Sequence, residues 1–475
     1  MNFDFSQVAI DTALALKVPM PIAKRNSAIV FAHVQGVIHI AASEDTAGEV
    51  KYSLLRYLPE HDSISVEIVE TETIKNSLNK VYGKRVNRDV GLTEESTAVR
   101  MVRELLSSAI INKASDIHLE PSDASSRCRM RVDGSMQSHS QYDSTDHHQM
   151  VSRIKVLADL NISERKLPQD GKFSFYSELQ SRSIDIRVAS IPTKHGEKIT
   201  LRLIGAMELP DKLESLGFDK KSVKSIHENL KIAQGLVLVT GPTGSGKSTT
   251  LYSFLKHLRK SEDLSLISLE DPVEYEMAGV TQVGIDHQRT SFSRALRSAL
   301  RHDPDVILVG EIRDAETASI AVRAALTGHL VLSTLHTNSA VTVPQRLVDM
   351  GVPAYLVAST LNLVISQRLV KKLCKYCQKE TDATSYGRSY KTDGCKYCMG
   401  SGYAGRAAVY EIMEIDNTIR RMVVSGQSEI DLHGYLQKNK VRSLWQEGKK
   451  KVNEGVIDAE SAERVIGRVD GLTQL

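Results

Sequence analysis

The stretch that decides the fold class is Gly235-Leu-Val-Leu-Val-Thr240, followed directly by Gly241-Pro-Thr-Gly-Ser-Gly246-Lys247-Ser248. A short apolar strand runs into a glycine-rich turn, and residues 249–259 read as a helix. This arrangement fits the phosphate-binding pattern G-x-x-x-x-G-K-[ST] in its strand–turn–helix context. Glycines let backbone N–H groups surround a phosphate, and the helix N-terminus adds positive charge. The sequence therefore predicts an α/β fold that binds a nucleoside triphosphate.

Individual residues of this loop have separate expected roles. Lys247 is expected to bridge the β and γ oxygens of the nucleotide, and the Ser248 hydroxyl is expected to bind Mg²⁺. The full set of expected nucleotide-binding residues is Gly241, Pro242, Thr243, Gly244, Ser245, Gly246, Lys247, Ser248 and Thr249.

Two acids follow apolar runs that resemble strands of the same sheet. Glu270 follows residues 264–269, and Glu311 follows Val306-Ile-Leu-Val-Gly310. Acids at the carboxyl ends of such strands lie in the crevice where ligands bind in open α/β sheets. We assign Glu270 as the base that orients the attacking water, and Glu311 to the Mg²⁺ shell. Glu276 is expected to be a solvated turn acid.

The apolar run 330–335 has His329 before it and His336 after it. Two histidines that flank a strand of a nucleotide-binding sheet can sense the γ-phosphate. A single histidine is more often an ordinary core residue. The residues alone leave both interpretations open.

Several arginines occupy positions from which they could bind phosphate groups. Arg297, Arg301 and Arg313 fall before and after the Glu311 strand. An arginine side chain, often from a neighbouring subunit, can stabilise the negative charge that develops on the γ-phosphate oxygens. The alternative is that these arginines only form a solvated helix face. Arg129, Arg131 and Arg187 alternate along expected strands, so each pattern presents its arginine on one face.

Four of the five cysteines form two C-x-x-C pairs, Cys374/Cys377 and Cys395/Cys398, which enclose 17 residues. This spacing is typical of a structural zinc site with four thiolates and no open position for catalysis. Cys128 has no partner in the sequence and is expected to be a buried thiol.

Composition limits the class of protein. A chain of 475 residues predicts about three domains at roughly 100–200 residues each. The net charge of +3 and the 41% hydrophobic content are those of an ordinary soluble protein. No apolar run is long enough for a membrane span, and the first 18 residues lack the features of a signal peptide. We expect a cytoplasmic protein that reaches a membrane only through partners.

The chain divides by pattern into four expected parts. Residues 1–90 form a small α+β docking or adaptor domain, and residues 95–205 form a second α+β domain. Residues 206–370 alternate short strands with amphipathic helices and form the ATPase core. Residues 371–475 form a cysteine-bearing module followed by helices.

In this order, the motifs resemble the secretion ATPases that power type IV pilus assembly and type II secretion. The resemblance runs from Ser96 to near the C-terminus, and more faintly through the N-terminal domain. Besides the phosphate loop, the cysteine pairs and the histidines, it is carried by Ala114-Ser-Asp-Ile-His118-Leu-Glu-Pro121, Arg129-Met-Arg-Val-Asp-Gly134, Pro168-Gln-Asp-Gly171, Glu270-Asp-Pro-Val-Glu274, Gly310-Glu-Ile-Arg-Asp314 and Gly402-Tyr-Ala-Gly-Arg406.

The resemblance implies a RecA-like ATPase domain preceded by a PAS-like second domain. It implies an acidic box at Glu270, a Walker B motif at Glu311, and a histidine box at His329 and His336. It also implies a hexameric ring in which the second domain closes on the nucleotide of the adjacent subunit, with arginines at positions Arg187, Arg297, Arg301, Arg313, Arg346 and Arg406. Two departures stand out: Lys172 replaces the usual arginine, and Ala407-Ala408 replaces a glycine-containing continuation.

The expected function is an ATP-driven hexamer at the cytoplasmic face of the inner membrane. It would act on a membrane platform protein and an adaptor, so that pilin or pseudopilin subunits are added. The cysteine pairs and the long N-terminal region, which retraction ATPases lack, favour an assembly motor. Type IV pilus and type II secretion stay open.

Two rival interpretations were weighed. A RecA-like hexameric nucleic-acid motor is disfavoured by the charge of only +3, the single Trp, and the 5% aromatic content without a basic stripe of stacking residues. A non-catalytic zinc scaffold is disfavoured by the intact set of acidic and basic partners.

Overall fold

The structure is a computed structural model of the chain. It describes residues 5, 10–34, 36–58, 63–83, 97–177, 182–205, 209–210, 212–261, 263–286, 289–395, 398 and 400–467. The chain separates into two compact units: residues 1–206 with 394–401, and residues 207–393 with 402–475. The polar, charged residues between 83 and 95, which the sequence pattern predicts to link the first two domains, lie outside the described residues apart from Gly83. The division into four domains stays a prediction.

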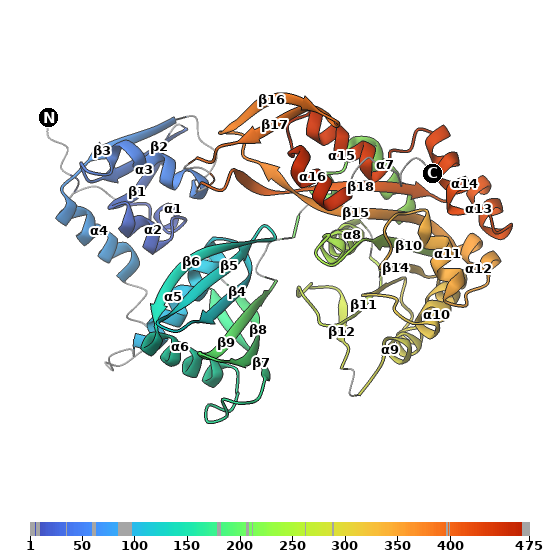
Figure 1. Cartoon of the computed structure of the whole chain (residues 1–475), viewed down its shortest axis with the longest axis horizontal. Coiled ribbons are helices and arrows are strands. Elements are labelled where there is room, and N and C mark those ends of the chain that lie inside the picture. Colours follow the sequence, from blue (N-terminus) through green and yellow to red (C-terminus); the bar gives the residue numbers. More distant parts are fainter. Residues whose placement is uncertain are drawn as a thin grey trace. The chain divides into compact units, whose positions relative to one another are not determined.

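The N-terminal part is a small α+β module (Figure 1). Its sheet has the order β1-β2-β3, with β1 and β2 antiparallel and β2 and β3 parallel. The Tyr82 hydroxyl lies 2.8 Å and 2.7 Å from the carbonyl oxygens of Ala15 and Val18, which ties the last helix to the start of the module. Its elements are α1 (Thr12–Ala15), α2 (Met20–Arg25), β1 (Ala28–Val34), β2 (Val37–Ala42), α3 (Ala47–Leu54), a 3-10 turn (Leu55–Tyr57), β3 (Ser63–Ile68) and α4 (Thr71–Gly83).

A six-stranded antiparallel sheet follows, in the order β6-β5-β4-β9-β8-β7. Helices α5 and α6 pack on one face of it, around Leu106, Ile117 and Ile154. Helix α6 begins at Ser144 because the Asp143 carboxylate caps it, accepting from the Asp146 N–H at 2.7 Å. The elements are α5 (Thr97–Ile111), β4 (Ala114–Pro121), β5 (Ser125–Val132), β6 (Ser135–Asp143), α6 (Ser144–Leu157), β7 (Gln169–Ser177), β8 (Arg182–Thr193) and β9 (Gly196–Ile204).

The second unit is built on a seven-stranded sheet in the order β12-β11-β13-β14-β10-β15-β18. All neighbouring strands run parallel except the last pair, β15 and β18. The sequence predicted the phosphate-loop strand at residues 235–240, and β10 has those bounds. The strands are β10 (Gly235–Thr240), β11 (Leu266–Glu270), β12 (Thr281–Gly284), β13 (Val306–Val309), β14 (Leu330–Leu335), β15 (Leu361–Leu373) and β18 (Tyr403–Glu414).

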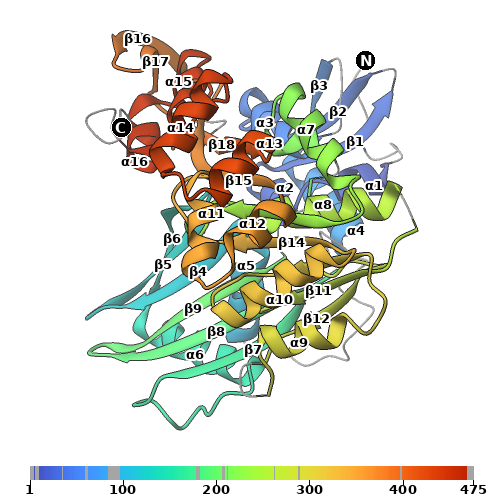
Figure 2. The same cartoon turned by 90° about the vertical axis from the view of Figure 1, so that its right-hand side faces the viewer.

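Helices cover both faces of this sheet, and its central strands β10, β13 and β14 are buried along their whole length. Leu236 and Leu238 point to one face with α9 to α14, while Val237 and Val239 point to the other with α7 and α8. Figure 2 shows α9 and α10 in front of the strands that they cover. The helices are α7 (Lys220–Leu230), α8 (Lys247–Ser261), α9 (Phe292–Ala299), α10 (Ala315–Leu326), α11 (Thr342–Asp349), α12 (Ala354–Thr360), α13 (Asn417–Val424) and α14 (Glu429–Lys438), and a 3-10 turn (Leu213–Leu216) precedes α7.

The C-terminal part contains strands that the sequence patterns did not predict. β15 and β18 form a long antiparallel ribbon, and the segment between the cysteine pairs folds as a hairpin. Tyr386 in the turn of that hairpin packs against Val452 and Ile457, which anchors the hairpin to the last helices. These elements are β16 (Gln378–Thr384), β17 (Gly387–Thr392), α15 (Leu444–Asn453) and α16 (Ala459–Ile466). Within the described residues, no helix has the length and apolar character needed to cross a membrane.

Candidate nucleotide-binding site

The glycine-rich loop between β10 and α8 has the backbone shape of a phosphate cradle. Gly241, Gly244 and Gly246 have φ values of 146°, 79° and 87°, a region that glycine adopts without strain. A Cβ atom at Gly241 would lie 2.4 Å from the Gln367 carbonyl oxygen, and one at Gly246 would lie 2.8 Å from Gln367 Nε2. The loop therefore needs glycine for its conformation and also for its close approach to β15.

Lys247 is the first residue of α8, and its side chain folds back over this loop. Its Nζ donates to the carbonyl oxygens of Gly241 and Pro242, at 2.8 Å and 3.0 Å. Burial lowers the pKa of Lys247, the negative charge of Glu311 opposes that shift, and the charge of Arg368 adds to it. The ammonium group is thus held at the mouth of the loop beside Glu311.

Strand direction decides which side chains share this site. β10, β11, β13 and β14 run parallel, with Thr240 level with Leu335 and Gly235 level with Leu330. We call the edge formed by their carboxyl ends the loop edge, and the edge formed by their amino ends the opposite edge. The phosphate loop, Glu270, Glu311 and His336 all follow strands at the loop edge.

Glu311 is the centre of a charged cluster at the loop edge. Its Oε2 lies 2.6 Å from Arg313 Nε and 3.7 Å from His336 Nε2, and its side chain is only 14% exposed. Burial lowers the pKa of His336, and the positive charges of Lys247 and Arg313 lower it further, although Glu311 opposes them. The structure thus brings together four of the residues that the sequence assigned to this site.

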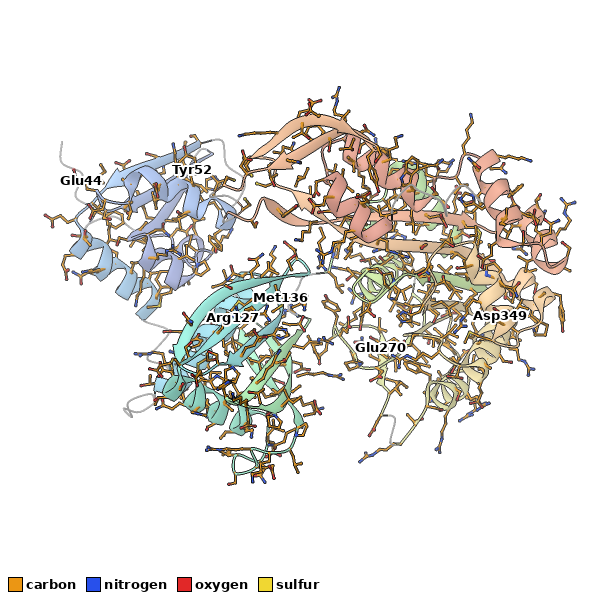
Figure 3. All side chains as sticks on the ribbon, viewed as in Figure 1. Glu44, Tyr52, Arg127, Met136, Glu270 and Asp349 are labelled. Atoms are coloured by element: carbon orange, nitrogen blue, oxygen red, sulfur yellow. The ribbon has the colours of Figure 1, made fainter. Side chains whose placement is uncertain are left out.

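Glu270 also ends a strand at the loop edge, but its carboxylate is enclosed. The side chain is 4% exposed and accepts hydrogen bonds from the Tyr252 hydroxyl, from Ser268 Oγ at 2.5 Å, and from Gln282 Nε2 at 3.3 Å. Burial raises the pKa of Tyr252, and the charge of Glu270 raises it further. Figure 3 labels Glu270 among the side chains of the parallel sheet. To act as the base, Glu270 would have to exchange one of these three partners for water.

His329 lies at the opposite edge, whereas the family resemblance groups it with His336 in a histidine box, so its role stays a prediction. Its Nδ1 lies 3.0 Å from the Ala324 carbonyl, and its own carbonyl accepts the Gly235 N–H at 3.1 Å. The six residues of β14 separate it from His336, which at about 3.3 Å per residue is roughly 20 Å. Within one chain, His336 is therefore the histidine of this pair that lies nearer the phosphate loop.

Arg297 lies on α9 and Arg301 just after it, and both side chains are exposed. The Arg297 guanidinium contacts Glu316 Oε1 at 2.5 Å, and Arg301 Nη1 donates to the Arg297 carbonyl at 3.2 Å. α9 starts beside Gly310 at the loop edge and leads toward the amino end of β13. The role of these exposed arginines stays a prediction.

Arg187 belongs to the other unit and stands in a row of exposed cations. On the face of the six-stranded sheet that α5 and α6 leave open, Lys172, Arg187 and Arg202 lie directly opposite one another on β7, β8 and β9. Like charges in such positions repel. Asp116 accepts from Arg202 Nε at 2.9 Å and so balances one member of the row. The row keeps a positive excess that suits an anion.

The four paired cysteines converge as the sequence predicted. Their sulfur atoms all lie within 4.8 Å of one another, and Cys395 Sγ is 3.7 Å from Cys398 Sγ. Four thiolates around zinc at about 2.3 Å would place sulfur atoms about 3.8 Å apart, so the donor set fits that ion. Cys128 is fully buried, as expected for a structural thiol.

Sequence reasoning missed Gln367 and Arg368, which lie on β15 beside the phosphate loop. Both are buried, at 3% and 7% exposure. The signal that could have found them is the polar triplet Ser366-Gln-Arg368 between the apolar runs 363–365 and 369–370. Buried polar groups need specific partners, and the nearest candidate partner was the loop itself.

Comparison with known proteins places the chain among secretion proteins. Residues 92–464 match the family described as type II/IV secretion system protein. The chain is 43% identical over 368 residues to the type II secretion system protein HxcR of Pseudomonas aeruginosa, and the aligned region covers 77% of each chain. It is 38% identical over 434 residues to the type IV pilus assembly ATPase PilB of Myxococcus xanthus, covering 88% of this chain and 76% of that one.

Solved structures agree at the level of the fold. The Legionella pneumophila ATPase DotB matches with a TM-score of 0.61 at 24% identity, covering 79% of this chain and 97% of that one. The pilus retraction motor PilT, solved with bound ADP, matches with a TM-score of 0.55 at 28% identity, covering 78% and 98%. The relatives named here are secretion and pilus proteins, which disfavours the rival interpretation as a nucleic-acid motor.

Proposed function

The chain belongs to the family of type II/IV secretion system proteins, and from that membership we propose how its residues perform the work of an assembly ATPase. As a member it is an ATPase of type II secretion or type IV pilus assembly. The proposal concerns the finer steps: which side chains hold ATP, how subunits complete the site, and what the motor moves.

The observation that carries the proposal is the cluster of Lys247, Glu311, Arg313 and His336 at the mouth of the glycine loop. Lys247 Nζ donates hydrogen bonds to two backbone carbonyls of the loop. The β and γ phosphate oxygens of ATP would replace these carbonyls as its acceptors. The neutral imidazole of His336 would then face the γ-phosphate, while Glu311 balances the surrounding cations.

A magnesium ion bound with the nucleotide would supply positive charge against the phosphate oxygens. Ser248, the second residue of α8, and Glu311 are the groups proposed to hold it. Oxygen donors of this kind are those that Mg²⁺ prefers. Glu270 is proposed as the group that orients the attacking water once closure of the site has loosened its bond to Tyr252 or Gln282.

A ring of six copies would complete this site. The exposed row of Lys172, Arg187 and Arg202 has the charge needed to meet a triphosphate, and we assign it to the nucleotide of an adjacent subunit. Arg297 and Arg301 would act at the same boundary between copies. In this scheme Lys172, at the end of the row, carries the same charge as the usual arginine but lacks the planar guanidinium group that can form two parallel hydrogen bonds. The six-stranded domain would be the PAS-like partner of the RecA-like core.

The tetracysteine cluster is proposed to bind one structural Zn²⁺ through Cys374, Cys377, Cys395 and Cys398. Zinc bound there would act as a cross-link between the two ends of the β16–β17 hairpin. Metal analysis of the purified protein should find one zinc per chain. Cys395→Ser should lose that zinc and lower the melting temperature.

The proposed work is the addition of pilin or pseudopilin subunits at the cytoplasmic face of the inner membrane. The motor would reach the membrane only through partners, namely a platform protein and an adaptor that binds the N-terminal module. In this scheme, ATP closes the domains of each subunit as rigid bodies, and hydrolysis reopens them.

The deciding experiment measures ATP hydrolysis by the full-length chain and by Lys247→Ala. Lys260→Ala, on the last turn of the same helix, is the matched control for loss of one positive charge. We expect Lys247→Ala to be inactive and Lys260→Ala to match the parent. Full activity in Lys247→Ala would remove the site assignment. Stimulation by single-stranded DNA, with none by a membrane platform protein, would favour the nucleic-acid motor instead.

A further inference from the structure

Gln367 is a buried side chain on β15 that lies against the phosphate-binding loop. β15 runs parallel to β10 with Ser366 level with Thr240, so Gln367 is level with the start of the loop. Its Nε2 donates to the Ser245 carbonyl at 2.9 Å, and its Oε1 accepts from the Thr250 hydroxyl at 2.9 Å. A single amide therefore holds both the turn of the loop and the first turn of α8.

The loop backbone packs directly onto this residue. The carbonyl oxygen of Gln367 approaches Gly241 so closely that a Cβ there would lie 2.4 Å away, and its Nε2 approaches Gly246 in the same manner. Any shift of β15 at this point would move the loop with it, because no space separates the two segments.

Arg368 extends the contact to the segment that follows β14. Its Nη1 donates to the Gln367 carbonyl at 3.0 Å, and its Nη2 donates to the Asn338 carbonyl at 2.7 Å. Asn338 comes two residues after His336. The same strand therefore fixes the phosphate loop on one side and the segment that carries His336 on the other.

Glu411 on β18 also belongs to this hydrogen-bond network. Its carboxylate is 5% exposed and accepts the Ala340 N–H at 2.8 Å. Burial raises the pKa of Glu411 and lowers the pKa of Arg368, while the charge of each group favours the ionised form of the other. The segment from His336 to Ala340 is thus tied to both β15 and β18.

We propose that Gln367 is a positioning residue for ATP hydrolysis: its two hydrogen bonds set the phosphate loop, and Arg368 keeps the His336 segment in register with it. The inference rests on the proposed nucleotide site, since Gln367 acts through the loop backbone and not on phosphate. Gln367 belongs to none of the sequence motifs described above.

The reason for a kinetic role is the precision that phosphoryl transfer requires. A displacement of about 1 Å in a site can cost roughly a hundredfold in rate. When Gln367 is changed, Lys247 and the N–H groups of the loop are still present, so nucleotide binding should change little. An interaction that matters mainly in the transition state lowers kcat more than it alters KM.

The test compares Gln367→Met with Asn362→Leu in the full-length protein. Asn362 is a matched control because it lies on the same strand, is 9% exposed, and donates its amide to a backbone carbonyl, that of Gln234, at 3.0 Å. That carbonyl is at the opposite edge of the sheet. Melting temperature, kcat and KM for ATP are measured for each protein.

We expect Gln367→Met to lower kcat about tenfold or more while KM changes less than about threefold, since two buried hydrogen bonds are lost, one to the loop and one to α8. Asn362→Leu should lower the melting temperature by a similar amount and keep kcat within about twofold of the parent. A kcat for Gln367→Met within threefold of the parent overturns the proposal. So does an equal loss of kcat in both variants.

A second pair of variants covers the case in which Gln367→Met does not fold. Gln367→Glu preserves size and the acceptor for Thr250, but it turns a second oxygen toward the Ser245 carbonyl and should lose at least as much kcat. Combining Gln367→Glu with Thr250→Val should cost less than the product of the two single losses, because the residues act as a unit. Losses that multiply would overturn the proposal.

The two proposals fail in distinguishable ways. If the parent chain and Lys247→Ala show the same absence of hydrolysis, the proposed nucleotide chemistry fails, and the positioning role with it. If the parent and Asn362→Leu hydrolyse ATP and Gln367→Met does so equally well, only the positioning role fails.

Discussion

The two edges of the parallel sheet carry similar residues and differ in what surrounds them. Each edge has a glycine with positive φ and a histidine at the end of β14: Gly246 and His336 at the loop edge, Gly328 and His329 at the opposite edge. At Gly246, a Cβ atom would meet Gln367 and Leu369, whereas at Gly328 nothing lies within 4 Å. His336 faces a carboxylate and an ammonium group, whereas His329 Nδ1 lies against the Ala324 carbonyl.

The difference teaches that strand direction, and not residue type, decides which residues of this sheet lie near the phosphate loop. Parallel strands bring all their carboxyl ends to one edge, and the loops that follow converge there. The residues before the strands serve the connections between helices and strands. A histidine at each end of a strand is symmetrical in the sequence but belongs to two unrelated environments in the fold.

The largest expected effect comes from adding one methyl group at each edge. Gly246→Ala should lower ATP hydrolysis by about a thousandfold, because the new Cβ would push the loop off β15 and misplace several phosphate-binding N–H groups. Gly328→Ala meets no neighbour, so its cost is backbone strain of about 1–3 kcal/mol in stability. Hydrolysis per folded molecule should stay near that of the parent. Steady-state kinetics and thermal unfolding distinguish the two outcomes, and equal kinetic losses would contradict the contrast between the edges.

The next effect concerns charge at the loop edge. Glu311→Gln should lower kcat by about a hundredfold, as removal of a positioned charged group in a site commonly does. The matched control is Glu228→Gln on α7, whose exposed pair with Lys224 spans 3.7 Å and contributes little. Hydrolysis assays at saturating ATP check this. A Glu311→Gln enzyme with full kcat would show that the cluster around Lys247 is structural only.

The histidine pair tests the comparison most directly. His336→Ala should lower kcat by roughly 10-fold to 100-fold, the range expected for a lost hydrogen bond to a charged group. His329→Ala should leave kcat within about twofold of the parent and change only the local packing of the opposite edge. Measuring both variants under the same conditions is sufficient. A larger loss in His329→Ala would mean that this histidine acts in another copy of the chain.

Much of the loop edge could be predicted because its motifs are local. The phosphate loop is a single run of eight residues whose strand and helix lie immediately beside it, and the structure has β10 and α8 there. The cysteine pairs are equally local in spacing, and their sulfur atoms do converge. In both cases, neighbouring residues in the sequence determine the geometry.

The rest depended on contacts between distant segments. The enclosure of Glu270 is made by Tyr252 and Gln282, which lie on other elements and carry no motif. Gln367 meets Ser245 across 122 positions of sequence. The β15–β18 ribbon was missed for the same reason, since its two strands are separated by the cysteine hairpin. Periodicity reports the burial of a residue and not the identity of its partner.

The smallest expected effect is a pH dependence of the melting temperature that arises at the opposite edge of the sheet. α8 starts at the phosphate loop and carries His257 near its far end, where the ring packs edge-on against His227 with centroids 4.3 Å apart. Burial lowers the pKa of His257 below its ordinary value, and the nearby positive groups, His227, Lys231 and Lys260, lower it further, while Glu214 opposes them.

The sign follows from which state takes up the proton first. The unfolded chain, with an ordinary histidine pKa near 6.5, binds a proton at higher pH than the folded chain does. This contribution to stability is therefore complete above about pH 6.5 and is lost as the pH falls through the lower pKa of the folded state. The melting temperature should fall more steeply with acidification in the parent than in His257→Gln. At pH 7.5 both proteins should hydrolyse ATP equally, since His257 is remote from the loop. An identical pH profile of melting in both would show that the pair makes no contribution, and a lower kcat in His257→Gln at pH 7.5 would connect the two edges after all.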